Sequence, residues 1–395
     1  MTSNTGSAET LDDQRRLLIE RWLAEFAAVA GQAHLADPDH KWRATSAWQK
    51  AIRRGNSDAA RWFVAALWNH DPKYVLYRLP IILLEEVGLG DPALVLAGMA
   101  ACGSKGGARR GLELASMLTE RAAAAVKDRS SCDLVVATER LIKVDPVVGR
   151  VFRASDLQTR KDVFLDRSRS PFERMSALWS LAGTTKYPGD DIRAANPISR
   201  DELAELIPHG FTRDLWTVGT GAMRDALPLG AILTAEYWAA SASAWAENEA
   251  TSIPPDELLA GYPASTYDQF TREGKRAIAH FLRASRPWRH WVSQYTPDRR
   301  RQKDITARFL FRVESGLVNR RLRYEPGSRL ITEAPLLATA QMFGIPAAEV
   351  QVGKRLLIEQ LPVLTQARRR VLEGEPSGAD YSARNTDESR SEGTR

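Results

Sequence analysis

The chain is poor in cysteine and has no long apolar segment. Its two cysteines, Cys102 and Cys132, lie far apart and at no spacing typical of a metal site. A secreted domain held by disulfides uses more cysteines, so we expect a reducing, cytoplasmic location. The polar N-terminus resembles no signal peptide. The most apolar short run, residues 79–84, is too short to cross a bilayer, so we expect no membrane association.

Nucleotide-binding and catalytic motifs are also missing. No Gly-x-x-x-x-Gly-Lys-Ser/Thr loop occurs, and the nearest approach, residues 98–105, has its lysine one place late and follows a predicted helix. The one candidate metal cluster, residues 34–40, contains two histidines and two aspartates in a pattern typical of a turn. The sequence therefore predicts no cofactor, no metal and no catalytic residue. An unrecognised enzyme with its site in residues 155–265 stays open as an alternative.

The remaining composition is that of a helical globular protein. Of the 395 residues, 44% are hydrophobic and 26% are charged, as in soluble domains, and this length allows two or three domains. The polar segments 1–9 and 375–395 have too few apolar groups to fold, so we expect them to be disordered. We expect an all-α, multi-helix protein with a helical bundle at 10–153, a helical middle region at 154–265 and a basic helical region at 266–374.

Local signals predict where the helices lie. Apolar periodicity, caps and breakers predict helices over 11–32, 43–54, 57–70, 72–88, 92–103, 108–127, 131–143, 146–153, 227–248 and 347–373. Gly55 and Asn56 are predicted to end one helix, and Ser57 or Asp58 to cap the next. Pro80 is predicted to kink the helix that contains it. A short β-hairpin is predicted from 310–313 and 322–331.

Residues 44–92 carry the most specific pattern in the chain. Its elements are Ser46, Ala47, Lys50, Ile52 and Arg53, then Asp58-Ala59-Ala60, then Asp71-Pro72, then Glu85-Glu86-Val87-Gly88-Leu89-Gly90-Asp91-Pro92. Their order and spacing resemble the region that follows the ATPase module in MgsA/RarA-type AAA+ ATPases. These are replication-associated recombination proteins related to clamp-loader subunits. The resemblance fades towards residue 150, and the chain departs from the pattern at Arg54, Pro80 and Gly90.

In that family this region forms a helical collar that holds subunits together. The resemblance implies a clamp-loader-collar-like bundle that forms a homo-oligomer or docks on an AAA+ ATPase. It implies that the interaction residues are Lys50, Arg53, Trp62, Glu85 and Glu86. For Glu85, at a helix end, a cap or an ion pair is the simpler interpretation. The ATPase module needs far more residues than the 43 that precede this pattern, so we expect a collar-like bundle without the ATPase module.

Positive charge is concentrated late in the chain. Residues 271–323 contain fifteen Lys and Arg but four acids, a local net charge of +11, while the whole chain carries +6. Aromatic residues are interleaved with them, among them Phe281, Trp288, Trp291, Tyr295, Phe309 and Phe311. Arginine neutralises phosphates, and exposed aromatic rings stack on unpaired bases. The tract predicts a nucleic-acid site made of Arg272, Lys275, Arg276, Arg283, Arg286, Trp288, Arg289, Trp291, Arg299, Arg300, Arg301 and Lys303.

Two local features refine this prediction, and two alternatives to it stay open. Residues 271–276 are predicted to lead into a helix whose first amides face an anion, and residues 299–301 to form an exposed turn or a first helical turn. The same charges are also typical of solvated helix faces, or of a surface for an acidic protein. The sequence thus predicts a non-catalytic DNA-associated protein of replication or repair. The alternative is a protein-interaction module that recruits or inhibits a clamp-loader-type AAA+ ATPase.

Overall fold

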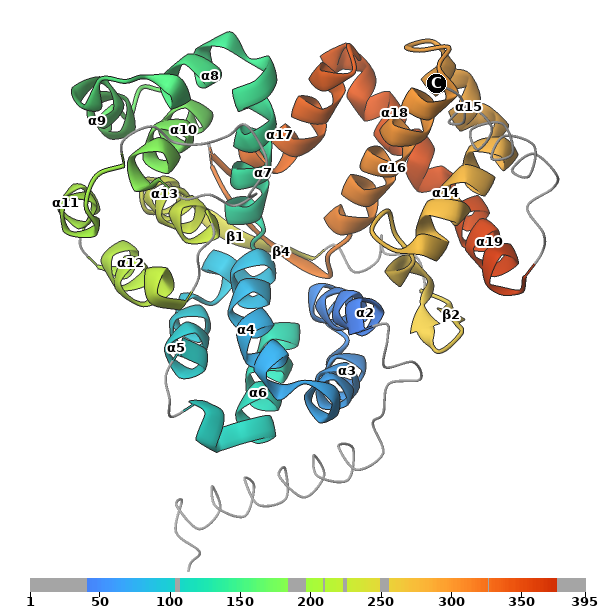
Figure 1. The fold of residues 1–395 in the computed structure, drawn as a ribbon, viewed down its shortest axis with the longest axis horizontal. Coiled ribbons are helices and arrows are strands. Elements are labelled where there is room, and N and C mark those ends of the chain that lie inside the picture. The colour runs from blue at the N-terminus through green and yellow to red at the C-terminus, as the bar shows by residue number, and fades with distance from the viewer. Residues whose placement is uncertain are drawn as a thin grey trace, which may run out of the picture. The chain divides into compact units, whose positions relative to one another are not determined.

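The computed structural model describes residues 41–103, 107–183, 197–208, 210–222, 226–248, 256–325 and 327–374 (Figure 1). The predictions for residues 1–40 and 375–395 lie outside these ranges. The described part is mostly helical and adds two small two-stranded antiparallel sheets, so the expected helical class is confirmed. The chain divides into two compact units. Unit 1 contains Met1–Pro254 and Gly316–Met342, and unit 2 contains Pro255–Ser315 and Phe343–Arg395.

Unit 1 begins with closely spaced helices whose boundaries follow the sequence signals. They are α2 (Lys41–Arg53), α3 (Ser57–His70), α4 (Pro72–Ile82), the π-helical turn η2 (Leu83–Val87), the 3-10 turn η3 (Gly88–Gly90), α5 (Pro92–Gly103) and α6 (Gly107–Ala124). Asp71 caps α4 by accepting the Tyr74 amide at 3.0 Å, with Pro72 in the first turn, as predicted. Asn56 caps α3 by accepting the Ala59 amide, so the prediction of Ser57 or Asp58 was wrong. Those two residues are already helical.

The helix that contains Pro80, α4, continues directly into a π-helical turn. Three residues later it widens into η2, and Gly88 ends that turn with a φ of 48°. A side chain at Gly88 would also lie 2.7 Å from the carbonyl oxygen of Asp128. Glycine is therefore required here both for its backbone conformation and for the close approach.

The rest of unit 1 contains a strand where the sequence predicted a helix. The helices are α7 (Ser130–Val144), α8 (Pro146–Arg153), α9 (Leu157–Leu165), α10 (Pro171–Ala182), α11 (Arg200–Leu206), α12 (Phe211–Ala222), α13 (Leu227–Ala239) and α17 (Gly327–Met342). The predicted helix over 227–248 was wrong in its second half, because Ala244–Asn248 is strand β1. β1 pairs antiparallel with β4 (Arg320–Tyr324), with Ala246 opposite Leu322. This pairing depends on a partner distant in sequence, which local patterns do not reveal.

Unit 2 is built around α14 (Arg272–Ala284), α15 (Arg286–Ser293), α16 (Arg299–Gly316), α18 (Ala347–Glu359) and α19 (Leu361–Leu372), with the small pair β2 (Leu258–Leu259) and β3 (Tyr262–Pro263). α14 packs on α19, and α15 packs on α18. The predicted hairpin was wrong, because residues 310–313 lie within α16 and Ile331 lies within α17. The single helix predicted over 347–373 is two helices, because Pro362 begins a new one.

Aromatic rings form the core of unit 2. Trp288 and Trp291 stack with ring centroids 4.7 Å apart, and Phe309 lies 6.0 and 5.6 Å from them. The Trp288 indole donates to the Thr306 hydroxyl at 2.8 Å, which ties α15 to α16. Gly353 of α18 lies so close that an added Cβ would be 2.6 Å from the Trp291 ring. The basic helices α15 and α16 are thus packed together through buried aromatic rings.

Candidate nucleic-acid interface

Helix α15 has two sharply different faces. Its inward face is buried and apolar: Trp288, Trp291 and Val292. Its outward face is exposed and mostly basic: Arg286, Arg289, His290 and Ser293. The outward positions recur at the three- and four-residue spacing of one helical face. Because the tryptophans fix the inward face in the core, these four side chains remain exposed to solvent.

The start of α16 completes this surface. Arg299 is the first residue of α16, as predicted for a first helical turn, and Gln302 follows one turn later. The Asp298 carboxylate accepts the Arg300 amide at 2.9 Å. The Gln302 side chain, only 8% exposed, donates to the Thr296 carbonyl at 2.9 Å. These bonds fix the connection between α15 and α16.

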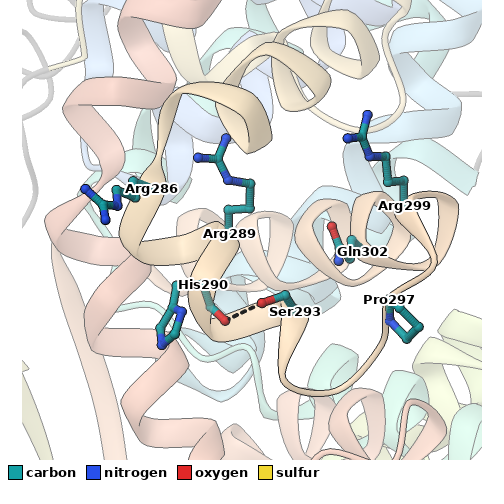
Figure 2. Close-up of a pocket in the computed structure, with 7 residues that line it drawn as sticks. All are labelled: Arg286, Arg289, His290, Ser293, Pro297, Arg299 and Gln302. Carbon is teal, nitrogen blue, oxygen red and sulfur yellow. Dashed lines mark hydrogen bonds between the residues drawn. The ribbon is translucent and has the colours of Figure 1, made fainter.

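The two helices and their connection line a largely open pocket of about 420 Å³. It is lined by Arg286, Arg289, His290, Ser293, Pro297, Arg299 and Gln302 (Figure 2). Three of these seven residues are arginines, and none carries a carboxylate. Figure 2 shows Arg289 and Arg299 extending in the same direction from the two helices, while Arg286 extends on the other side of α15. Arg289 also donates to the Arg283 carbonyl at 2.7 Å, which orients its guanidinium.

All ten predicted Lys and Arg residues of the interface are exposed: Arg272, Lys275, Arg276, Arg283, Arg286, Arg289, Arg299, Arg300, Arg301 and Lys303. None of them forms an ion pair with a residue in the described ranges. The pocket brings together three of them, Arg286, Arg289 and Arg299. Three more continue along the first turns of α16. The other four belong to α14 and its end, and they do not line the pocket.

The two tryptophans of the prediction are not available for base stacking. Trp288 is fully buried and Trp291 is 5% exposed, because both belong to the aromatic core. Including them in the interface was therefore wrong. An exposed ring that the prediction missed is Phe270, which is 70% exposed and packs edge-on against Phe311 at 5.1 Å. No sequence signal distinguishes Phe270 from a buried aromatic residue.

The basic tract of the sequence is not one surface. Arg308 forms an ion pair with Asp304, and Arg312 lies over the Phe311 ring. The last three basic residues of the tract, Arg320, Arg321 and Arg323, belong to β4 in unit 1. There Arg321 is buried and Arg323 pairs with Glu247 at 2.6 Å. The local charge of +11 is therefore divided between two units, which a count along the sequence does not reveal.

The residues implied by the collar resemblance form an internal network. Glu86 is fully buried and accepts from Arg53 at 2.8 and 2.6 Å, while Arg129 approaches it at 2.5 Å. The Gln49 amide adds a further bond at 2.7 Å. Burial alone would raise the pKa of Glu86, but the charges of Arg129 and Arg53 hold that pKa well below its usual range. Glu86 therefore stays ionised inside unit 1.

The prediction that these side chains contact a partner needs correction. Lys50 and Arg53 are buried along with Glu86, so their side chains are enclosed within unit 1 and face no partner surface. Glu85 is half-buried and pairs with Arg78 at 3.4 Å, which confirms the simpler interpretation as an ion pair. Trp62 is half-buried and packs edge-on against Phe63 at 5.0 Å.

Within the described ranges, no group of three His, Cys, Asp or Glu side chains could hold a metal ion. No helix in those ranges is both long enough and apolar enough to cross a membrane. Neither cysteine forms a disulfide, and burial raises the pKa of the Cys102 thiol to about 12. Cys102 is thus a thiol, not a reactive thiolate, near neutral pH.

No protein-family model, curated protein or solved structure matches this chain. The basic pocket between α15 and α16 is a candidate site defined by the chain's own side chains.

Proposed function

We propose that this chain is a non-catalytic, DNA-associated protein that binds phosphate groups on the basic face of unit 2. We define this basic face as Arg286, Arg289, Arg299, Arg300, Arg301 and Lys303. The observation that carries the proposal is a pocket that is lined by exposed arginines from two helices and by no carboxylate. Guanidinium groups bind phosphate oxygens through charge-assisted, two-point hydrogen bonds.

The extent of the basic face favours a polymer of phosphates over a single anion. Beyond the pocket, Arg300, Arg301 and Lys303 remain exposed on the first turns of α16. These residues cover about 6 Å of helix rise from Arg299. A nucleic acid presents repeated phosphates at comparable intervals and gains free energy from counterion release at each contact. The exposed Phe270 and its neighbour Phe311 add an aromatic surface elsewhere in unit 2.

The experiment is fluorescence anisotropy with labelled single- and double-stranded oligonucleotides at low and moderate salt. The test variant reverses charge at Arg299, Arg300 and Arg301. The matched control reverses charge at Lys73, Arg150 and Arg167, which are exposed in unit 1. Both variants change the net charge by the same amount, so a general electrostatic effect would weaken binding equally in both.

We expect salt-sensitive binding by the wild type, a loss of at least tenfold in the first variant and a small change in the control. The proposal fails if the wild type binds no oligonucleotide. It also fails if the two variants weaken binding to the same extent.

A second candidate function is supported by exposed aromatic residues on unit 1. Trp42 is 67% exposed and packs edge-on against Tyr74 at 6.0 Å, and Tyr77, one turn after Tyr74 in α4, is 63% exposed. Exposed aromatic clusters are enriched at protein interfaces. Under this alternative, unit 1 self-associates or docks on a clamp-loader-type AAA+ ATPase through this surface. Recovery of such an ATPase from nuclease-treated extract by the wild type, but not by a Trp42→Ala, Tyr77→Ala variant, would support it.

A further inference from the structure

We propose that the pocket between α15 and α16 binds the terminal phosphate monoester of a nucleic-acid strand. This proposal rests on the proposed function and makes it more specific. It gives the pocket a different role from the rest of the basic face. The pocket would recognise a phosphorylated strand end, while Arg300, Arg301 and Lys303 would contact internal phosphates.

The charge of the pocket suits a terminal phosphate. A phosphate monoester carries about −1.5 to −2 charges at pH 7 and offers three strong acceptor oxygens. An internal phosphodiester carries one negative charge and offers two such oxygens. Arg289 and Arg299 extend in the same direction from the two helices, while Arg286 extends on the other side of α15 (Figure 2). Two planar guanidinium groups supply more donors than a diester can accept, and a monoester uses them better.

Nearby carboxylates do not neutralise this charge. None of the seven residues that line the pocket is acidic. Asp298 is adjacent in sequence to two of them and accepts the Arg300 amide at 2.9 Å, and among the described residues its carboxylate forms no ion pair with a pocket arginine. Arg289 uses one terminal nitrogen for the Arg283 carbonyl and retains its other donors. The guanidinium groups are therefore positioned by the protein and still able to bind an anion.

The pocket is a largely open depression lined by three parts of unit 2. α15 forms one side, the first turn of α16 forms another, and Pro297 in the connection lines a third. Gln302, nearly buried and bonded to the Thr296 carbonyl, adds a fixed polar side chain. A volume of about 420 Å³ lies in the usual range for small-ligand sites. This volume accommodates a terminal phosphate group, and the preference for a strand end follows from the charge of the pocket.

The test compares oligonucleotides of one sequence that differ only at their ends. One carries a 5′-phosphate, one a 3′-phosphate and one hydroxyl groups at both ends, each with an internal fluorophore. Affinities are measured by anisotropy with the full chain. We expect the wild type to bind one phosphorylated form about fivefold or more tightly than the hydroxyl form. Inorganic phosphate in excess should reduce this preference.

Two double variants test whether the preference for a phosphorylated end arises in the pocket. Arg289→Gln with Arg299→Gln alters the pocket, and we expect the ratio between phosphorylated and hydroxyl ends to fall to about one. Arg272→Gln with Arg276→Gln removes the same charge from exposed positions on α14 outside the pocket. In that control the ratio should persist even if overall affinity decreases. Circular dichroism melting confirms that both variants fold.

The outcomes separate this inference from the proposed function. Equal binding of all three oligonucleotides by the wild type overturns the terminal-phosphate proposal and leaves nucleic-acid binding intact. Persistence of the preference in the pocket variant, or its loss in the α14 variant, also overturns it. Absence of binding to any oligonucleotide overturns the proposed function itself.

Discussion

Arg53 and Glu86 form a two-point ion pair inside unit 1, with the Arg53 Nε and Nη2 atoms 2.8 and 2.6 Å from the two carboxylate oxygens. Arg53 is the last residue of α2, and Glu86 belongs to the π-helical turn η2. Arg129, just before α7, approaches the same carboxylate at 2.5 Å. One buried glutamate therefore joins three segments that lie far apart in the sequence. In this chain, the most specific residues of the 44–92 pattern stabilise the interior of unit 1.

Replacing Glu86 with glutamine should destabilise unit 1 strongly. The change removes the carboxylate that two buried guanidinium groups share, and breaking a buried pair in this way costs about 3–5 kcal/mol. Urea unfolding followed by circular dichroism measures the loss. Glu85→Gln is the control, because Glu85 is half-buried and its pair with Arg78 is longer. Equal effects of the two substitutions would contradict a central role for Glu86.

Because of Lys127, the free energy of unfolding should increase as the pH rises above about 8. Burial lowers the pKa of Lys127 to about 8, although the charge of Glu86 opposes this shift. In the unfolded chain a lysine titrates near about 10.4, so between these values the unfolded state binds more protons than the folded state. The free energy of unfolding should therefore rise with pH across that interval, relative to a Lys127→Met variant.

Denaturant unfolding of both proteins at several pH values from neutral to about 10 tests this expectation. The Lys127 ammonium also donates to the carbonyl oxygens of Ala122, Ala123 and Ala125. The variant will therefore be less stable at every pH, and the difference in slope is the informative quantity. Parallel pH profiles for the two proteins would show that Lys127 does not titrate in this interval.

A methyl group at Gly353 should destabilise unit 2. The added Cβ would lie 2.6 Å from the Trp291 ring, which is itself stacked on Trp288. Overpacking of this kind typically costs about 1–3 kcal/mol. Thermal unfolding followed by tryptophan fluorescence measures the change for Gly353→Ala. Gly316→Ala is the matched control, since a Cβ there meets no atom within 4 Å. A neutral effect at Gly353 would indicate looser packing between α15 and α18.

The salt dependence of binding should report how many phosphates the basic face contacts. Each phosphate contact contributes about 0.7 to the slope of log K against log salt for a single strand, and about 0.9 for a duplex. Removing the charge of Arg300 should therefore lower the slope by about one such step, because Arg300 is exposed and unpaired among the described residues. Titrations at four or more salt concentrations measure it. An unchanged slope would place Arg300 outside the interface.

The local signals in the sequence predicted much of the helical framework. Asp71 with Pro72 starts α4, and Asp91 caps the next helix by accepting the Leu94 amide at 3.0 Å. Such caps succeed because they depend on groups within one helical turn. Strand β1 was missed because its partner β4 is distant in sequence. An alanine-rich segment shows no local preference strong enough to reveal that pairing.

The candidate interface was predicted only in part, because charge is visible in the sequence whereas burial is not. The exposed arginines of α15 and α16 follow from charge, which a sequence displays directly, and from the spacing of one helical face. Trp288 and Trp291 alternate with them in the same short helix, and the sequence does not show which aromatic rings are buried. That depends on the approach of α18 at Gly353 and on Phe309 of α16.

The sequence by itself determined the helical class, most helix boundaries and the concentration of positive charge between residues 271 and 323, because each depends on nearby residues or on simple composition. Only the tertiary structure decided that Arg53 and Glu86 are internal, that the basic tract is divided between two units, and that Arg289 and Arg299 line one pocket. The physical reason is that burial and convergence are set by contacts between segments distant in the chain, and those contacts leave no local periodicity to read.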